Sequence, residues 1–311
     1  MNKLEANISL VLITFFAAIQ YAFLAGVPDD VSNFAFLAVT NLLGFLIMLV
    51  FFYRELTRID GLQVGQSLLL SALLVCFNAF LLAGSGDVGA MVSASVLSAY
   101  FVFVPFLGKL FFKEKIDTRS FPGIVIVLIG LFLMMNADVH GLMRRGVLFL
   151  LLADISFSFY ILTLGRISSN SNPSVIAMGQ MFFSFLFSLA LWSAESKVHG
   201  VRMSLPTSAP AFWAGVIFIS FFIRGLYGIV SIYAMRYVSA LNTSLIFSSE
   251  VAMTMVMSPV LSALFGMPKE VITPMRAVGA AVMVLGILAA DGSITRQLVK
   301  KLKRRRVHAK A

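Results

Sequence analysis

Charged residues are scarce in this chain. Asp, Glu, Lys and Arg together make up 12% of its 311 residues, whereas an ordinary soluble domain contains about 25%. Hydrophobic residues make up 59%, and a soluble core does not need so much apolar sequence. The surplus must face lipid, so the composition excludes a soluble globular protein and predicts one that spans a membrane.

Cysteine and histidine are almost missing, which excludes several kinds of site. The single cysteine, Cys76, cannot form an internal disulfide, and its place in an apolar stretch suggests a packing role. The three histidines, His140, His199 and His308, fall in predicted loops or the tail, so no histidine pair is available inside the membrane for zinc or haem. The sequence also lacks HExxH, GxSxG and nucleotide-binding motifs. We therefore expect no metal, no cofactor, no catalytic residues and no enzymatic activity.

Ten apolar stretches fill most of the chain, and each is about as long as a membrane-spanning helix, which needs about 20 residues. The first of them lacks a clear cleavage motif, so we expect a span there and not a removable signal peptide. The short connecting loops favour antiparallel helix pairs and leave no separate extramembrane domain. The predicted spans are residues 5–26, 31–53, 65–84, 88–112, 119–136, 145–166, 173–194, 211–235, 239–265 and 272–290.

The basic residues are unevenly distributed over the predicted loops. If the N-terminus is inside, most of the 24 Lys and Arg residues lie on the cytoplasmic side. We therefore expect a multi-pass protein of the cell's inner membrane, with both termini in the cytoplasm and the loop Glu195–Pro210 outside. The tail contains the run KKLKRRR. Such a cluster beside a last span is typical of contact with anionic lipid in the bilayer, so we expect no nucleic-acid binding.

The two halves of the chain resemble each other. An offset of 139 residues aligns the front of each half, and offsets of 154 and 156 align the back. The aligned pairs are Tyr21 with Tyr160, Ser32 with Ser171, Asn33 with Asn172, Ala38 with Ala177, Asn41 with Gln180, Glu114 with Glu270, Gly123 with Gly279, Gly130 with Gly286, and Pro105 with Pro259. A unit of five spans crosses the membrane an odd number of times, so its second copy is inverted, as in many secondary transporters.

The fold that follows is an all-α polytopic membrane protein with ten transmembrane helices, arranged as two inverted five-helix repeats. The first repeat covers residues 1–136, the second, inverted repeat covers 137–290, and a basic cytoplasmic tail covers 291–311. The paired glutamates would cap helix ends, and the paired glycines would permit close helix approach. Pro105 and Pro259 would kink the fourth and ninth helices, either around a cavity or without a functional role.

Two stretches carry a resemblance to a known family. One is PFLGKLFFKEKIDTRSFPGIVIVLIGLFLM, with the spacing Glu-x8-Gly-x6-Gly, and the other is RGVLFLLLADISFSFY. They resemble the EamA family of the drug/metabolite transporter superfamily, and the resemblance covers about residues 5–290. It implies a ten-helix bundle with both termini inside and a central cavity, but no particular substrate, because the family handles many metabolites. The second copy has GMPKE in place of a short Gly-Glu turn, so we expect a local difference in its outer closure.

Three charged residues fall well inside predicted spans: Asp154, Arg224 and Glu250. A charge at the bilayer centre costs at least about 2.5 kcal/mol, so it usually faces a cavity or a partner. Arg224 and Glu250 are equally far from the short loop between the eighth and ninth spans, which places them at the same depth and predicts that they pair. The pair is either a structural salt bridge or part of a central binding site, and both roles can hold at once. Asp154 would face cavity water or compete with Glu250 for Arg224.

Uncharged polar residues also lie within the spans: Gln20, Asn41, Asn78, Tyr100, Tyr160, Gln180 and Tyr227. They are either hydrogen-bonded contacts between helices or a polar ring around a binding site. With Phe101, Phe103 and Phe159 nearby, such a ring would suit an amphipathic organic solute better than a bare ion. The candidate substrate-binding set is these seven residues with Asp154, Arg224 and Glu250. Arg224 would meet a carboxylate or phosphate, and Glu250 an amine or a proton.

These observations favour an inner-membrane secondary transporter that moves a small metabolite, an amino acid or an amphipathic drug by alternating access. Because no nucleotide-binding loop is present, energy would come from a substrate or proton gradient, with Glu250 as the candidate residue for proton coupling. A solute channel, which favours rings of like charge or carbonyls, and an intramembrane enzyme are the alternatives. The sequence leaves open the substrate, the direction of transport, the coupling ion and the oligomeric state.

Overall fold

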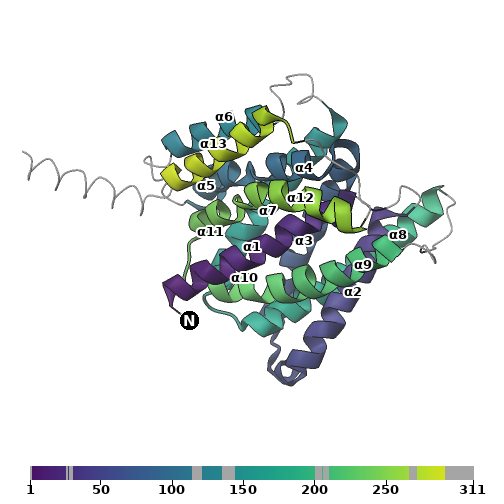
Figure 1. Cartoon of the computed structure of the whole chain (residues 1–311). Helices are drawn as coiled ribbons and strands as arrows, with labels where there is room; N and C mark the ends of the chain where they lie inside the picture. Colours follow the sequence, from purple (N-terminus) through teal and green to yellow (C-terminus); the bar gives the residue numbers. More distant parts are fainter. Residues whose placement is uncertain are drawn as a thin grey trace, which may run out of the picture.

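Helices form nearly all of the described part of the computed structural model (Figure 1). It describes residues 2–25, 27, 31–113, 121–134, 144–199, 205, 210–265 and 272–290, and these ranges contain no strand. In a bilayer, backbone polar groups must be satisfied within the segment, so long apolar stretches fold as helices. Four predictions lie outside the described residues: the Glu114–Glu270 pair, the local difference at GMPKE, the boundary between residues 136 and 137, and the basic tail.

The helices follow the predicted spans in chain order. The first half contains α1 (Lys3–Ala25), α2 (Asn33–Phe52), the 3₁₀ helix η1 (Tyr53–Arg58), α3 (Gly61–Val88), α4 (Ala90–Leu97), α5 (Tyr100–Phe112) and α6 (Phe121–Met134). The second half contains α7 (Arg145–Ile167), α8 (Pro173–His199), α9 (Pro210–Phe218), the π-helix η4 (Ile219–Tyr227), α10 (Gly228–Ala234), α11 (Ala240–Phe247), α12 (Glu250–Phe265) and α13 (Pro274–Ala290). Eight helical segments of the described chain are long and apolar enough to cross a membrane, and α6 and α13 are shorter apolar helices. The protein is therefore an all-α, multi-pass membrane protein.

Local contacts fix where several helices begin. The Ser32 hydroxyl accepts hydrogen bonds from two amides at the start of α2. At the start of α3, Asp60 accepts one from the amide of Gln63 at 2.7 Å. Such caps satisfy amides that the first helical turn leaves unpaired. Only Gly89 stands between α3 and α4, and its φ of 82° is a left-handed conformation that glycine adopts without a steric penalty. These two helices are therefore joined without a loop.

The fourth and ninth predicted spans are each interrupted. The chain divides after Ser98 into α4 and α5, and after Ser248 into α11 and α12. The hydroxyl of each serine donates a hydrogen bond to the carbonyl oxygen four residues earlier, at 2.8 and 2.9 Å. Such hydrogen bonds tend to bend helices. The sequence predicted the irregularity at Pro105 and Pro259. Both prolines lie inside helices, α5 and α12, so kinks at these two positions stay a prediction, and the interruptions precede them.

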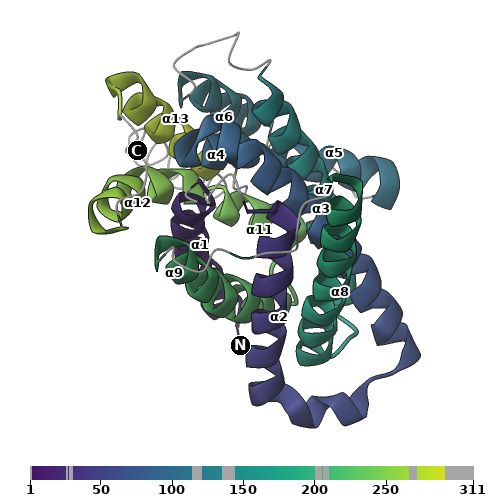
Figure 2. The same ribbon diagram turned by 90° about the vertical axis from the view of Figure 1, so that its right-hand side faces the viewer.

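Equivalent helices of the two halves make equivalent contacts. α1 packs against α12, and its counterpart α7 packs against α5. α3 packs along α7, just as the segment α9–η4–α10 packs along α1. Two further pairs, α2 with α8 and α6 with α13, join counterparts directly, as Figures 1 and 2 show from two sides. This exchange of partners is what two inverted repeats around a shared axis produce.

α6 and α13 approach each other through glycines. A Cβ atom added at Gly130 would lie 2.8 Å from the carbonyl oxygen of Gly279, and one added at Gly286 would lie 2.7 Å from the amide nitrogen of Val127. A real Cβ does not fit at such distances, so the two backbones pack directly against each other. The predicted close approach at the repeated glycines is confirmed.

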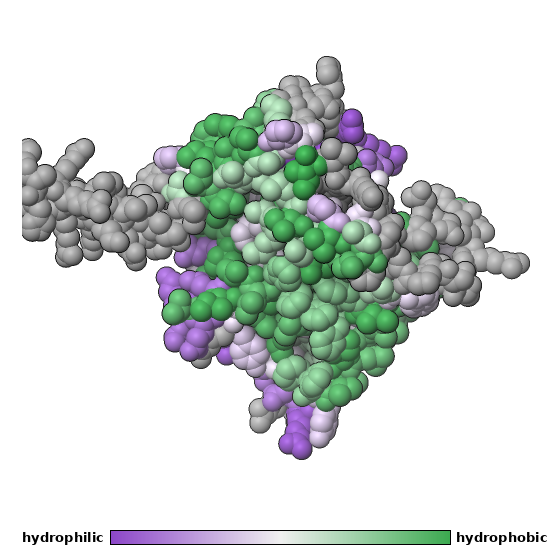
Figure 3. Space-filling view, viewed as in Figure 1, coloured by the Kyte–Doolittle hydropathy of each residue, from purple (hydrophilic) through white to green (hydrophobic). Residues whose placement is uncertain are grey.

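The outer surface of the bundle is largely apolar. Large hydrophobic side chains such as Val50, Leu110 and Leu264 are mostly exposed. Figure 3 shows that hydrophobic residues cover most of one face, with hydrophilic groups toward its margins. A surface of this kind is suited to lipid and not to water. Cys76 on α3 is also exposed, so the predicted packing role for its side chain was wrong.

Candidate functional site

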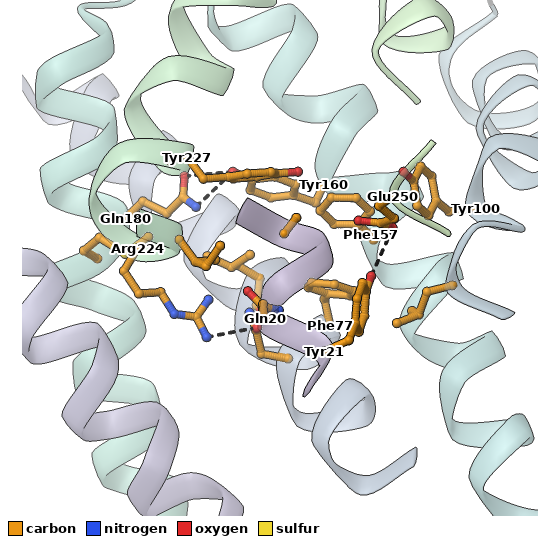
Figure 4. A pocket seen from close by; sticks show the side chains of 17 residues that line it. Gln20, Tyr21, Phe77, Tyr100, Phe157, Tyr160, Gln180, Arg224, Tyr227 and Glu250 are labelled. Carbon is orange, nitrogen blue, oxygen red and sulfur yellow. Dashed lines mark hydrogen bonds between the residues drawn. The ribbon is translucent and has the colours of Figure 1, made fainter. Parts of the chain in front are cut away.

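A cavity lies between the two halves of the bundle (Figure 4). Its volume is about 50 Å³. Its lining comes from helices of both halves, with contributions from α1, α3, α4 and α5 and from α7, α8, η4, α10 and α12. The lining residues are Ala17, Gln20, Tyr21, Leu74, Phe77, Asn78, Leu97, Tyr100, Phe157, Tyr160, Gln180, Met181, Ile223, Arg224, Tyr227, Gly228 and Glu250.

Eight of the ten predicted site residues line this cavity. They are Gln20, Asn78, Tyr100, Tyr160, Gln180, Arg224, Tyr227 and Glu250. The chain thus brings together polar residues that are far apart in the sequence and belong to different spans. Asn41 and Asp154 do not line it. Tyr21 does, and the sequence analysis left it out of the site although its repeat partner Tyr160 was included.

Arg224 lies at one end of the cavity, on the π-helix η4. Its Nη2 donates a hydrogen bond to the Oδ1 of Asn78 at 3.0 Å, while its Nε is buried without a hydrogen-bond partner. π-Helical turns are frequent at functional sites. On α2, Gly44 permits a close approach, because a Cβ there would lie 2.4 Å from the Cβ of Arg224. The guanidinium is therefore held at the cavity with its buried Nε–H donor unused.

Tyr160 and Gln180 form a neutral hydrogen-bonded pair near Arg224. The Nε2 of Gln180 donates to the Oη of Tyr160 at 3.0 Å, and Arg224 interacts electrostatically with the same tyrosine. The backbone carbonyl of Gln180 also accepts a hydrogen bond from the Oγ of Ser71 at 2.8 Å. These contacts join α7, α8 and α3, so they fix the wall of the cavity at its cationic end.

Glu250 lies at the other end of the cavity and is the first residue of α12. Its Oε1 accepts a hydrogen bond from the Oη of Tyr21 at 3.0 Å, and its side chain is only 5% exposed. A carboxylate in the first turn of a helix is favoured by the positive end of the helix dipole. The interruption of the ninth span creates that helix start inside the bundle, which explains how an acidic residue is accommodated there.

Arg224 and Glu250 do not form the predicted ion pair. Each has its own neutral partner, Asn78 for Arg224 and Tyr21 for Glu250, and Figure 4 shows the two charges on different sides of the cavity. Equal distance from a loop fixes the depth of a residue on a straight helix but not the direction in which it points. Here the π-helix lies in one of the two spans and the interruption in the other. Both features alter that direction.

Aromatic rings form the wall between the two charged ends. The rings of Phe77 and Phe157 stack with centroids 4.5 Å apart, and Tyr100 meets Phe157 edge-on at 5.1 Å. The sequence predicted Phe101, Phe103 and Phe159 for this role, and none of the three lines the cavity. Phe159 instead packs against rings at the end of α5. One signal was available for Phe157, because it lies three residues from Tyr160 and therefore on the same helix face.

The two predicted residues outside the cavity have different environments. The Nδ2 of Asn41 donates to the Oγ of Ser188 at 3.3 Å, so Asn41 joins α2 to α8. Asp154 is fully buried on α7, and neither of its carboxylate oxygens has a hydrogen-bond partner. It therefore neither faces the cavity nor pairs with Arg224, contrary to both sequence-based interpretations.

The arrangement is equipped for binding an organic solute. It presents a guanidinium at one end, a carboxylate at the other and aromatic faces between them. Among the described residues, no group of three or more His, Cys, Asp or Glu side chains could hold a metal ion.

Comparisons with known proteins agree with this architecture. A solved crystal structure matches with a TM-score of 0.63 at 15% identity, over 94% of this chain and 97% of the other. An uncharacterized transporter from Archaeoglobus fulgidus is 24% identical over 191 residues, which span 60% of this chain and 58% of that protein. The family model of EamA-like transporters matches twice, over residues 4–136 and 144–290. The chain therefore belongs to the EamA-like transporter family.

Proposed function

We propose that this protein is a secondary carrier that moves a small amphipathic zwitterion across the inner membrane by alternating access. The observation that carries the proposal is the cavity between the halves, with Arg224 and Glu250 on different sides and stacked aromatic rings between them. A solute with an anionic group, an amine and an apolar body would match all three parts. An apolar amino acid is the simplest such compound.

Each cavity residue has a defined role in this proposal. Arg224 binds the carboxylate or phosphate of the solute, since its Nε is buried without a partner. Glu250 binds the amine of the solute. The hydrogen bond from Tyr21 holds the side chain of Glu250 in position. Phe77 and Phe157 contact the apolar body. A charge-assisted hydrogen bond is roughly twice as strong as a neutral one, so the two charged ends would select for the ends of the solute.

The inverted repeats and the mixed charges favour a carrier over a channel, because a channel usually has rings of like charge or carbonyls. Counterflow in vesicles tests this choice. Vesicles loaded with unlabelled solute should take up labelled solute transiently, since a carrier exchanges one molecule for another. Uptake that never exceeds simple equilibration, with no stimulation by internal solute, would support a solute channel.

Three ligands test the zwitterion assignment: L-phenylalanine, 3-phenylpropanoate, which lacks the amine, and 2-phenylethylamine, which lacks the carboxylate. A ligand at roughly 100 times its Kd stabilises a folded protein by about 2.7 kcal/mol. The melting temperature of the purified protein should rise with L-phenylalanine and much less with either analogue. An equal rise with the amine alone would indicate a cationic drug-like substrate and contradict the role of Arg224.

Variants at the two ends provide the matched test. Arg224→Gln should abolish the response to L-phenylalanine, and Glu250→Gln should abolish both the response and counterflow. Arg54→Gln, at an exposed arginine outside the cavity, is the control and should behave as the wild type. If Glu250→Gln still exchanges solute but no longer concentrates it along a pH gradient, then Glu250 carries the proton and does not bind the amine.

We expect both termini in the cytoplasm, with the basic tail against anionic lipid. Arg166 donates to the carbonyl of Phe112, Arg236 to that of Ser168, and Asn172 to the carboxylate of Glu55. These contacts gather the ends of several predicted cytoplasmic segments on one face, which supports the orientation. A phosphatase reporter fused after Ala311 should be inactive, and one inserted at Lys197 should be active. The opposite pattern would overturn the orientation.

A further inference from the structure

Asp154 is the charged residue whose environment the substrate cavity does not explain. Its side chain is 0% exposed, and both carboxylate oxygens are buried without a hydrogen-bond partner. It does not line the cavity, so a bound solute would not contact it. An ionised carboxylate in a dry, membrane-embedded site needs a partner or a counter-charge. The interactions of Asp154 are with Glu250 and with the backbone of Tyr100, so they include no positively charged side chain.

Asp154 lies behind the two helix interruptions. One turn along α7, the Oγ of Ser158 donates to the carbonyl oxygen of Tyr100, the first residue of α5, at 3.2 Å. The two interruptions also touch each other, because the Oγ of Ser248 donates to the carbonyl oxygen of Ser98 at 3.2 Å. Glu250 follows Ser248 by two residues. The packing of α7 therefore places Asp154 next to the junction from which Glu250 and Tyr100 project into the cavity.

The charged groups around Asp154 are acidic. It interacts electrostatically with Glu250 on α12, and Tyr21 on α1 interacts with both carboxylates. No Lys, Arg or His of the described chain acts on it in the same way. The other charged groups of the helices packed on α7 lie near helix ends: Asp60 just before α3, Asp87 near its end, and Lys109 near the end of α5. The thiol of Cys76, midway along α3, is exposed.

From this geometry we propose that Asp154 is a proton-binding site, separate from the substrate cavity, and that the charge of Glu250 favours its protonated form. Two carboxylates close together in a dry site cannot both be ionised without a counter-charge. A proton on Asp154 removes its charge. The two carboxylates then have different roles: Glu250 contacts the substrate, and Asp154 binds the proton that drives transport.

The coupling that follows rests on the proposed function. When the amine of a substrate binds Glu250, its positive charge offsets the carboxylate, and Asp154 can then ionise. The O–H bond of Asp154 breaks, the proton leaves to water, and the carboxylate keeps the electron pair. When the substrate departs, Asp154 takes up a proton again. One amine therefore exchanges for one proton, and the protein works as an antiporter.

Infrared difference spectroscopy of the full-length purified protein tests the proton site without any substrate. A protonated carboxyl group has a carbonyl band that shifts in heavy water, and an ionised one lacks it. The wild type at neutral pH should show this band, Asp154→Asn should lose it, and the control Glu5→Gln, at an exposed carboxylate, should keep it. If Asp154→Asn keeps the band unchanged, the proposal is wrong.

A sodium site is the rival occupant of the same carboxylates. It would appear as a wild type without the band, whose melting temperature rises with sodium chloride while that of Asp154→Asn does not. A wild type without the band would overturn the proposal whether or not sodium acts. Should Asp154→Asn fail to fold, Asp154→Leu replaces it, because an apolar side chain of similar size suits a buried, uncharged position.

Transport in vesicles separates this inference from the proposed function. With L-phenylalanine as the probe, Asp154→Asn should still exchange labelled for unlabelled solute, but a pH gradient should no longer concentrate it. Gradient-driven accumulation by Asp154→Asn would overturn the proton site and leave the carrier intact. Absence of any exchange in the wild type would overturn the zwitterion carrier, and the infrared result would still decide the proton site.

Discussion

The two halves of this chain share a scaffold but not a chemistry. The family model matches both, and their helices make equivalent contacts. The charged residues inside the spans, Asp154, Arg224 and Glu250, nevertheless all belong to the second half. The first half lines the cavity with neutral polar groups such as Gln20 and Asn78. Repetition accounts for the shape of the site, and the differences between the copies account for what it can bind.

The helix interruptions show this difference in chemistry between the two halves. Each half breaks one span after a serine that bonds back along the helix. Two residues after that serine, the first half has Tyr100 and the second has Glu250, and both side chains line the cavity. Equivalent helix interruptions thus place the neutral ring of Tyr100 and the carboxylate of Glu250 at the cavity.

The third span of each half differs in its backbone as well. In the first half, α3 is one continuous helix of 28 residues. In the second half, the corresponding span contains the π-helix η4, and Arg224 lies on it. A π-turn changes the direction of the side chains that follow it. The π-helix therefore sets the direction of the Arg224 side chain, and the corresponding helix α3 of the first half has no such turn.

Replacing Glu250 by tyrosine, the residue at the equivalent place in the first half, should reduce transport more than any other change. Glu250→Tyr makes the second interruption resemble the first and removes the anionic end of the cavity. Loss of a charged contact worth about 3 kcal/mol corresponds to roughly a 100-fold fall in uptake. Uptake of L-phenylalanine in vesicles measures it, with Tyr100→Phe as the control that keeps the ring. Comparable losses in both variants would mean that the two halves contribute equally.

The repeat partners Tyr21 and Tyr160 allow a direct test of the same comparison. Tyr21 donates to a carboxylate, and Tyr160 bonds to the amide of Gln180. Hydrogen bonds to charged groups contribute about 1.5–3 kcal/mol, and neutral ones about 0.5–1.5. Tyr21→Phe should therefore reduce uptake by roughly 10- to 100-fold and Tyr160→Phe by at most about tenfold. The reverse order would contradict the assignment of the charged end.

Gly44→Ala, a substitution in the first half, should displace Arg224 in the second half. The added Cβ would lie 2.4 Å from the Cβ of Arg224, so α2 and η4 must move apart. Overpacking of this kind costs about 1–3 kcal/mol. Thermal unfolding in detergent should show the loss, together with weaker uptake. Gly65→Ala on α3, where nothing lies within 4 Å of the new Cβ, is the matched control and should leave both unchanged.

Cys76→Ser should have the smallest effect. The side chain is exposed on the outside of α3, and surface substitutions usually change stability by less than about 0.5 kcal/mol. The melting temperature and uptake of the variant should match those of the wild type. A clear loss would show that this surface is covered by something other than lipid.

The spans, their number and their repeat follow from composition and spacing, because length and hydrophobicity alone decide what can cross a bilayer. The polar lining could also be predicted, since a polar side chain in a span is costly unless it has a partner or a cavity. The pairing of Arg224 with Glu250 could not. It depends on the direction of each side chain, which the π-helix and the interruption after Ser248 both change.

Aromatic positions were harder to predict for a related reason. Phe is so frequent in this chain, with 30 residues, that a phenylalanine near a polar residue carries little information. Phe77 and Phe157 differ from Phe159 only in the helix face that they occupy. Asp154 shows the same limit: its depth could be predicted, but its separation from the Lys and Arg side chains of the described residues depends on how the helices pack.

The glycine contact between α6 and α13 restricts how the halves can move. Neither helix lines the cavity, and this pair makes the most extensive helix–helix contact in the described chain. Because the two backbones touch, sliding along the contact would drive carbonyl and amide groups into each other. A rotation about the line of contact keeps the spacing constant. If the protein works by alternating access, as we propose, we expect the halves to rotate about this contact, with a larger displacement at α2 and α8, which lie away from it (Figure 2).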